Sequence, residues 1–262
     1  MNNEVVGQRY VGACVKSIQE YDIGEELVIR PRALIMPGDD IEAPTKGSVV
    51  GEGIISFSGG LSAVNRTDAQ NAFLYASLVA NKSYPLEHQG KEWYMLFREV
   101  MTNAGWTPIS KFYSDLQVSG TSVRMDKLVL EILGSVIAGI AVPGPATALM
   151  LKVAGDAIAA LQKRDTALTV YERNVLQNGV GGVTAGACTE VNGTAIFALG
   201  AVRFTRRNTS TKVLFVDVDI RNVDLYRGET VFEKNDTIAQ ATREIIAQKL
   251  VSHITKKIDY DI

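Results

Sequence analysis

The sequence has few of the residue types on which metal centres and nucleophilic catalysis most often depend. Its 262 residues include two cysteines and two histidines. Two cysteines cannot form a disulfide scaffold, and neither belongs to a Cys-x-x-Cys pair or another zinc-binding spacing. A P-loop and a G-x-S-x-G nucleophile motif are absent as well. The sequence therefore predicts no metal site and no catalytic residues.

The sequence also lacks an excess of basic residues and has few aromatic residues. Lys and Arg total 27 against 29 Asp and Glu, a net charge of −2, so we expect no nucleic-acid partner. Aromatic residues make up 7% of the chain, which predicts an interior of aliphatic and small side chains. The first residues do not follow the basic-then-apolar order of a secretory signal peptide, so we expect synthesis in the cytosol with reduced thiols.

The composition is otherwise that of a folded globular protein, with 46% hydrophobic and 21% charged residues. Short apolar runs broken by Gly and Pro predict strands within the first 60 residues. The runs cover residues 27–29, 33–36, 49–50 and 54–57. Apolar residues then recur at helical spacing, which predicts helices over 68–80 and 91–104.

The most regular pattern lies between Met125 and Leu161. Apolar residues recur at i, i+3, i+4 and i+7 on both sides of Pro143-Gly144-Pro145, which predicts an αα-hairpin. Residues 132–151 carry no charge, and twenty apolar residues are long enough to span a bilayer. Because the Pro-Gly-Pro break divides this run, we favour a core hairpin of a soluble protein. A membrane-inserting hairpin of the pore-forming kind is the alternative.

Beyond Gln177 the apolar period changes to two, which predicts strands. The pair Asn192-Gly193 is a strong signal for a two-residue β-hairpin turn, and it places Cys188 opposite Phe197. The remaining expected elements are a strand over 213–220, a turn over 227–229 and a last helix that starts at Asp236. We therefore predict one α+β domain over residues 1–262, an antiparallel sheet covered by helices with the αα-hairpin in its core.

The strand around Cys188 is almost without side chains, since Gly and Ala fill most of residues 179–187. Such a strand packs poorly unless something else occupies the space, and the preceding hairpin offers a wide aliphatic face. We therefore expect the thiol to point into an apolar, under-filled space. Its candidate lining residues are Leu128, Val129, Ile132, Val136, Val153, Ile158, Phe197 and Leu199. A free cysteine is usually a small buried hydrophobic residue, and that interpretation of Cys188 remains open.

Several segments together resemble the Erwinia virulence factor (Evf) family. They are 78–84, 92–100, 104–106, the apolar hairpin, 185–188 with Asn192-Gly193, 198–204, 225–229 and the closing helix. The resemblance begins near residue 65, and the first 60 residues have no match. It implies a bacterial α/β protein that promotes persistence in an insect gut and holds palmitate as a cysteine thioester in an apolar cavity. Cys188 matches that cysteine by its place in the hairpin, whereas Cys14 has no counterpart.

On this resemblance we expect a non-enzymatic virulence factor with palmitate or a similar fatty acid on Cys188 and no other cofactor. Its expected partners are the fatty acid and, peripherally, a membrane. We expect it in the cytoplasm of the producing bacterium, at a membrane, or released to the host without a signal peptide. Two alternatives stay open: a pore-forming toxin that uses residues 125–161, and an acyl hydrolase or acyltransferase with His88 or His253 as base.

Overall fold

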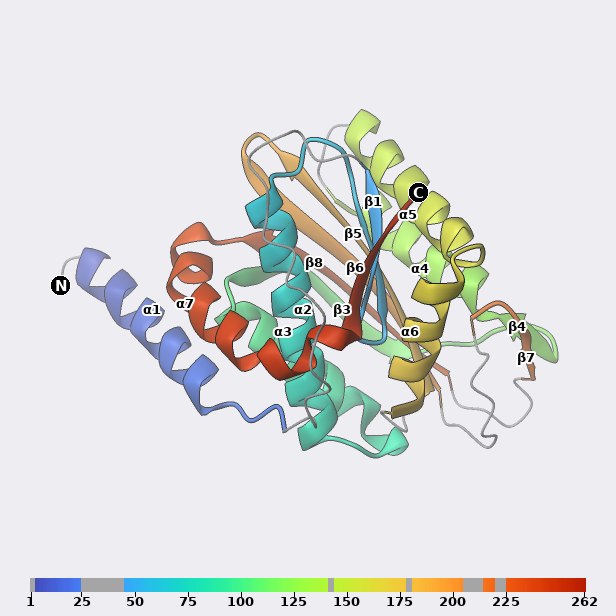
Figure 1. The fold of residues 1–262 in the computed structure, drawn as a ribbon, viewed down its shortest axis with the longest axis horizontal. Coiled ribbons are helices and arrows are strands. Elements are labelled where there is room, and N and C mark those ends of the chain that lie inside the picture. The colour runs from blue at the N-terminus through green and yellow to red at the C-terminus, as the bar shows by residue number, and fades with distance from the viewer. Residues whose placement is uncertain (1–2, 25–44, 141–143, 178–180, 205–213, 220–224) are drawn as a thin grey trace.

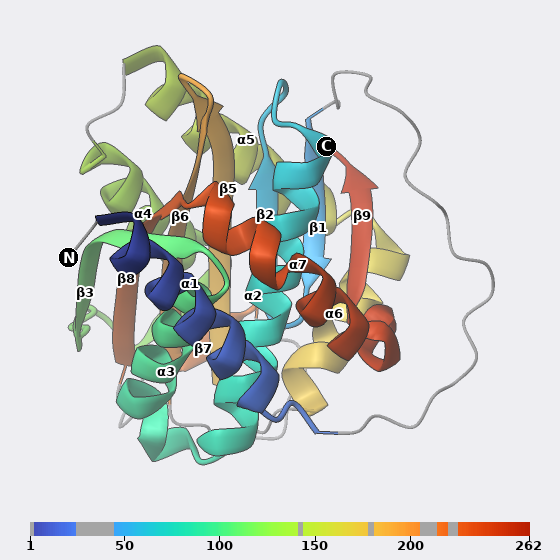
Figure 2. The same cartoon turned by 90° about the vertical axis from the view of Figure 1, so that its left-hand side faces the viewer.

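The computed structural model describes residues 3–24, 45–140, 144–177, 181–204, 214–219 and 225–262. Its centre is a seven-stranded sheet with helices on both faces (Figures 1 and 2). In spatial order the strands are β3 (Trp106–Asp115), β8 (Leu225–Lys234), β6 (Thr194–Phe204), β5 (Gly181–Val191), β2 (Gly53–Phe57), β1 (Lys46–Val50) and β9 (Lys257–Asp261). All neighbours are antiparallel except β2 and β5, which pair in parallel. The predicted α+β class is confirmed, and one parallel pair is added to the antiparallel sheet.

Two groups of helices cover the two faces of this sheet (Figure 1). The first group is α1 (Asn3–Glu20), α2 (Ala63–Ser83), α3 (Gly90–Asn103) and α7 (Asp236–Lys249). The second group is α4 (Met125–Ala138), α5 (Gly144–Leu161) and α6 (Asp165–Gln177). The shorter elements are the 3-10 helices η1 (Glu87–Gln89) and η2 (Val251–Lys256) and a separate two-stranded sheet of β4 (Ser122–Arg124) and β7 (Asp217–Asp219).

The two faces enclose different hydrophobic layers. The layer between the sheet and α2, α3 and α7 contains nine buried Trp, Tyr and Phe side chains, and we name it the aromatic layer. The layer between the sheet and α4, α5 and α6 contains three buried aromatic side chains among many Ile, Leu, Val and Ala, and we name it the aliphatic layer. The few aromatic residues of the chain are therefore concentrated on one side of the sheet.

The αα-hairpin and the two earlier helices form where the apolar spacing predicts them. α4 and α5 are the predicted arms of the hairpin. α2 contains the helix expected over 68–80, and α3 agrees with the helix expected over 91–104 to within one residue at each end. α2 begins earlier than expected because the Ser62 side chain accepts a hydrogen bond from the Asn65 backbone and caps the helix. α4 approaches the sheet closely at Gly200, where a Cβ would lie 2.8 Å from the backbone nitrogen of Leu133.

Three predictions about strands are wrong. Residues 3–20 form α1, because this helix buries Cys14 and Ile18 and packs against α7 and α3. Among the described residues before residue 60, only β1 and β2 are strands. The runs over 27–29 and 33–36 lie outside the described residues. Of the strand expected over 213–220, the described residues 214–219 contain β7, which pairs with β4 and not with the main sheet. The turn expected over 227–229 lies within the continuous strand β8. That residues 1–262 form one domain stays a prediction.

Candidate functional site

The turn that places Cys188 is formed as predicted. The Asn192-Gly193 pair has positive φ angles of 51° and 79°, as a two-residue type I′ turn requires. β5 and β6 therefore pair with Cys188 opposite Phe197. Phe57 of β2 and Phe232 of β8 continue the same row across the sheet. Cys188 thus lies among aromatic side chains on a central strand, and it is 1% exposed.

Cys188 faces the aromatic layer, on the opposite side of the sheet from the α4–α5 hairpin. Successive side chains of a strand point to opposite faces, so Ala187 joins the aliphatic layer while Cys188 joins the aromatic one. Of the predicted lining residues, only Phe197 and Leu199 share this face with Cys188. The other six belong to α4 and α5: Leu128, Val129, Ile132, Val136, Val153 and Ile158. The structure therefore does not bring the eight residues together around the thiol.

Side chains of β6 occupy the space that the glycines of β5 leave on this face. A Cβ at Gly186 would lie 2.7 Å from side-chain atoms of both Leu199 and Phe197. At Gly182 the Arg203 side chain takes the corresponding place, 3.3 Å from a Cβ. The under-filled space expected around Cys188 is thus closed, because large side chains of the partner strand lean over the glycines.

Burial controls the chemistry of the Cys188 thiol. Desolvation raises the pKa of the thiol far above its ordinary value, although the Lys234 ammonium group lowers it, and the Glu190 carboxylate raises it further. The thiol therefore stays protonated at neutral pH and is a weak nucleophile. Glu190 is two residues beyond Cys188 in β5, and Lys234 is two residues beyond Phe232 in β8. Strand alternation puts both charged residues on the face of Cys188.

An ionic cluster that the sequence did not predict links these two residues to α2 and α7. Asp68 accepts two hydrogen bonds of 2.8 Å from Arg243 and lies 2.8 Å from the Lys234 ammonium group. Lys234 also donates to Asn65 at 2.5 Å, and the Asn65 amide donates to Glu190 at 2.8 Å. We name these five residues the Asp68 cluster. Its bonds join residues 125 to 175 positions apart, so no local pattern in the sequence reveals it.

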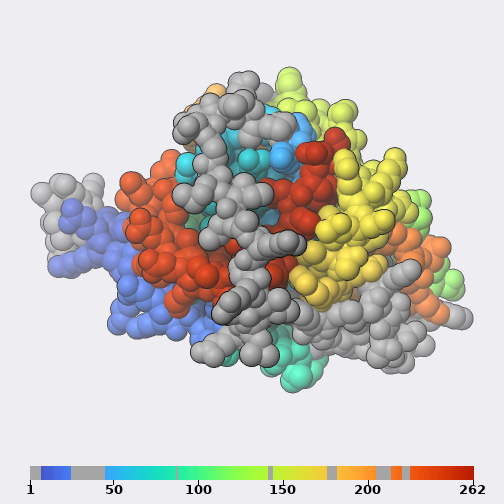
Figure 3. Space-filling view, viewed as in Figure 1, coloured from blue at the N-terminus to red at the C-terminus, as the bar shows by residue number. Residues whose placement is uncertain are grey.

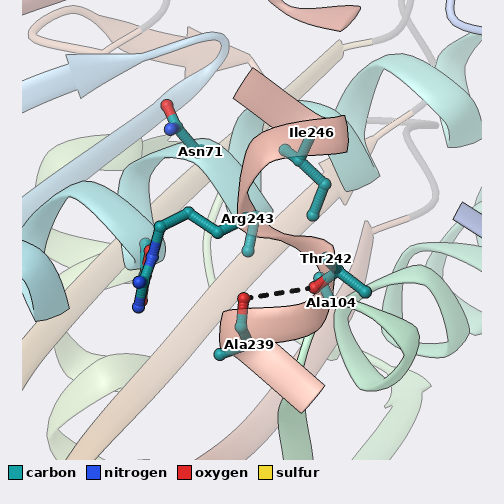
Figure 4. Close-up of a pocket in the computed structure, with 8 residues that line it drawn as sticks. Asn71, Ala104, Ala239, Thr242, Arg243 and Ile246 are labelled. Atoms are coloured by element: carbon teal, nitrogen blue, oxygen red, sulfur yellow. Dashed lines mark hydrogen bonds and ion pairs between the residues drawn. The ribbon is translucent and has the colours of Figure 1, made fainter. Parts of the chain in front are cut away.

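A pocket beside this cluster lies between α2, α7 and the end of α3 (Figure 4). It is lined by Asp68, Asn71, Ala72, Ala104, Ala239, Thr242, Arg243 and Ile246. Its volume is about 10 Å³, roughly the space of one water molecule. The Thr242 hydroxyl turns back to the carbonyl oxygens of Ile238 and Ala239, at 2.9 and 3.5 Å. The pocket is therefore too small for a fatty acyl chain as it stands.

A larger open hollow of about 460 Å³ lies where α6 begins beside β9. Much of its lining is charged: Lys163, Arg164, Asp165, Asp259 and Asp261. An acyl chain needs apolar surroundings, so this hollow does not suit one.

The other residues considered as reactive groups are spread over the fold. Cys14 is buried in α1, where its thiol is hydrogen-bonded to Tyr10. His88 is exposed in η1, whereas His253 is buried in η2 with Nε2 3.3 Å from the carbonyl oxygen of Gly24. Within the described part of the chain, no three His, Cys, Asp or Glu side chains gather closely enough to hold a metal ion.

These features define an α+β protein with a buried thiol at the centre of its sheet. No protein-family model and no curated protein matches the chain. Among solved structures, the structure of the Evf virulence factor is similar, with 14% identity and a TM-score of 0.31 over 78% of this chain and 83% of that one. A delta-endotoxin is similar with 12% identity and a TM-score of 0.36 over 78% of this chain and 89% of that one. Neither score is high enough to assign the chain to a family.

Proposed function

We propose that the protein is a non-enzymatic, lipid-carrying virulence factor that holds one fatty acyl chain as a thioester on Cys188, associates with membranes and promotes persistence in an insect host gut. The observation that carries this proposal is the position of the Cys188 side chain, fully buried on a central strand within the aromatic layer. The resemblance of residues 65–262 to the Evf family supports the same cysteine. Cys14 lies on the peripheral helix α1 and is the matched control.

Thioester formation at this position needs an activated acyl donor, such as an acyl thioester. The Cys188 sulfur attacks the acyl carbonyl carbon, the new S–C bond replaces the donor's S–C bond, and the thiol proton goes to the departing thiolate. Because burial raises the pKa of Cys188, this reaction requires an opening of the aromatic layer. After reclosure the same burial keeps water from the thioester, which favours one stable attachment over repeated turnover.

The acyl chain needs room that the described structure does not leave beside Cys188. A palmitoyl chain has about 14 methylenes, whose transfer from water is worth on the order of 11 kcal/mol. We propose that the chain enters the aromatic layer between α2 and α7, where the small pocket of Figure 4 lies between the two helices. α7 is held there by the Arg243–Asp68 ion pair and by the 2.7 Å hydrogen bond from the Asn235 backbone to Gly105. Entry of the chain therefore requires α7 to move outward.

Intact-mass measurement of protein purified from a bacterial host tests the attachment. The expected result is one added fatty acyl mass that neutral hydroxylamine removes. Cys188→Ser should have the mass of the bare chain, and Cys14→Ser should keep the acyl group. A wild-type protein with only the bare mass contradicts the proposal, and so does an acyl group that remains in Cys188→Ser.

Incubation with excess acyl thioester tests the non-enzymatic part. The protein should take up at most one acyl group and then stop. Release of many free fatty acids per protein molecule, lost in Cys188→Ser, would instead establish the thiol-enzyme alternative.

A further inference from the structure

α5 is an apolar helix of which a large part is not covered by the rest of the protein. It is the one helix among the described residues that is long and apolar enough to cross a membrane, and 33% of it is buried. Met150, Val153 and Ala154 lie in the interior, whereas Leu149 is 45% and Leu151 39% exposed. The exposed leucines lie near the start of α5, in the part of the hairpin that has no charged residue.

Contacts between the two arms show which of their residues lie at the same level. A Cβ at Gly134 of α4 would be 3.5 Å from the Leu151 side chain. A Cβ at Gly155 of α5 would be 3.7 Å from the Leu130 side chain. The two helices therefore run antiparallel with Gly134 beside Leu151, and the end of α4 lies beside the start of α5.

Neither arm has a charged residue between this level and the turn. Lys152 is the first charged residue of α5, directly after Leu151, and Glu131 is the last charged residue of α4, three positions before Gly134. Beyond them, towards the turn, both arms are uncharged on every side. We name this region the hairpin tip, with residues 134–140 at and just after the end of α4 and residues 144–151 at the start of α5. Its exposed residues are Ser135, Ala138, Gly139, Gly144, Pro145, Ala148, Leu149 and Leu151.

The length of the hairpin tip limits how far it can enter a bilayer. Residues 144–151 are eight helical residues, which span about 12 Å. One leaflet of hydrocarbon is about 15 Å thick, half of the bilayer core. The tip is therefore long enough to enter one leaflet and too short to cross both.

The hairpin tip lies at one end of the molecule, as Figures 1 and 2 both show for the start of α5. The turn between β5 and β6 lies at the same end in both views. In the space-filling view, residues of this part of the chain reach the surface at the top edge (Figure 3). A membrane at this end meets the tip before the body of the protein, and Cys188 is four residues from that β-turn.

We propose that the hairpin tip is a lipid-binding surface that enters one leaflet of a phospholipid bilayer. All of the exposed residues except Ser135 are apolar, and none is an aromatic or Arg side chain of the kind that protein interfaces favour, so hydrocarbon is the partner that fits. The charged residues nearest the tip are of both signs, so binding depends little on anionic lipid. The proposal rests on the membrane association of the proposed function, and it does not require the acyl chain on Cys188.

Flotation with phosphatidylcholine vesicles tests the proposal on the full chain. Leu149→Glu should weaken vesicle binding at least tenfold, because a charged residue is costly inside hydrocarbon. Met95→Glu on α3 is the matched control, since Met95 is 58% exposed on the other side of the sheet, and its binding should equal wild type. In Leu149→Trp the indole emission should shift to the blue with vesicles and be quenched by lipids brominated in one leaflet. Entrapped dye should stay inside.

Each opposite result overturns the proposal. These are unchanged binding of Leu149→Glu, unshifted emission of Leu149→Trp, and dye release of the kind a spanning hairpin causes. A wild-type dimer that Leu149→Glu separates, without vesicle binding, would identify a second copy of the chain as the occupant. The same series in Cys188→Ser separates this proposal from acylation. Loss of the acyl mass reports on Cys188, whereas dependence of the remaining binding on Leu149 reports on the tip.

Discussion

The two faces of the central sheet are stabilised in different ways. In the aromatic layer, rings meet in defined geometries, such as Phe73 edge-on to Phe97 at 5.4 Å and Trp106 edge-on to Phe197 at 5.6 Å. Ionic groups enclose its two ends, with the Asp68 cluster at one and the Arg203–Glu52 pair at the other. The aliphatic layer depends on buried area and close backbone approach, and neither gives directional contacts.

This difference shows which helices can move without loss of the rest of the fold. α2 and α3 cannot shift without breaking ring contacts of the aromatic layer, whereas α7 has no aromatic residue and is held by the Arg243–Asp68 ion pair. The α4–α5 hairpin has a tip free of charge and partly exposed, so that end can exchange water for lipid while its base stays on the sheet. The aromatic layer therefore fixes the environment of Cys188, and the aliphatic side contains the surface that we propose for membrane contact.

The largest expected effect concerns the ion pair of the aromatic layer. Arg203 Nη2 lies 2.7 Å from Glu52 Oε1, both side chains are at most 3% exposed, and the guanidinium stacks 3.4 Å from the Trp93 ring centre. Arg203→Met leaves the Glu52 carboxylate buried without this cation. We expect it to lower the unfolding free energy by about 3–5 kcal/mol, measured by urea denaturation. The control Lys16→Met, whose partner Glu20 is 3.7 Å away and whose ion pair is well exposed, should lose at most about 1 kcal/mol. A loss as small as the control's would mean that the pair does not stabilise this layer.

The next effect concerns the close backbone contact of the aliphatic layer. Gly200→Ala places a Cβ 2.8 Å from the Leu133 nitrogen, so α4 must move away from the sheet. We expect a loss of about 1–3 kcal/mol in unfolding free energy, because such overpacking cannot relax through a side chain. Gly12→Ala on α1 has nothing within 4 Å of its Cβ and should be neutral or slightly stabilising. Equal stability of both variants would show that α4 is not held against the sheet at this point.

Local sequence patterns predicted the helices and the turn whose formation depends mainly on neighbouring residues. The apolar spacing gave α4 and α5, and the Asn192-Gly193 turn gave the register that places Cys188 opposite Phe197. The pattern did not reveal α1, whose Gly7 and Gly12 are poor helix formers and whose helix depends on packing against α7. β3 was missed because it is a largely exposed edge strand without apolar alternation.

The wrong prediction that Cys188 faces the α4–α5 hairpin has a different origin. The sequence shows that Cys188 and Ala187 point in opposite directions, but it does not show which of the two faces the hairpin covers. That depends on how the chain crosses from α5 through α6 to β5, a path no short pattern encodes. The Asp68 cluster was missed for a related reason, since Asp68 and Lys234 meet only in the folded chain.

A smaller effect is expected from alkaline pH on the tyrosines of the aromatic side. Desolvation raises the pKa of Tyr113 to about 12, although Arg203 lowers it, and the unfolded value is about 10. The contribution of Tyr113 to the unfolding free energy is therefore fully present below pH 10 and is lost as the pH rises towards 12. Because Tyr113 is partly exposed, its share is below about 1 kcal/mol at pH 11. Thermal unfolding of Tyr113→Phe should show a shallower decline than wild type between pH 10 and 12. Parallel declines would show that Tyr113 titrates alike in both states.

The smallest effect on stability, with an opposite effect on lipid binding, is expected at Lys152. Its ion pair with Asp156 spans 2.9 Å, but both side chains are well exposed, so Lys152→Leu should change the unfolding free energy by no more than about 0.5 kcal/mol. Because Lys152 ends the hairpin tip, the substitution extends the uncharged part of α5 to Gly155. Vesicle binding should therefore become several-fold stronger, since an added leucine enters hydrocarbon in place of a charge. Lys82→Leu, which removes the exposed Lys82–Asp22 pair on the aromatic side, should leave both stability and vesicle binding unchanged. Equal vesicle binding of Lys152→Leu and Lys82→Leu would mean that the hairpin does not contact the bilayer, and that membrane association arises elsewhere in the molecule.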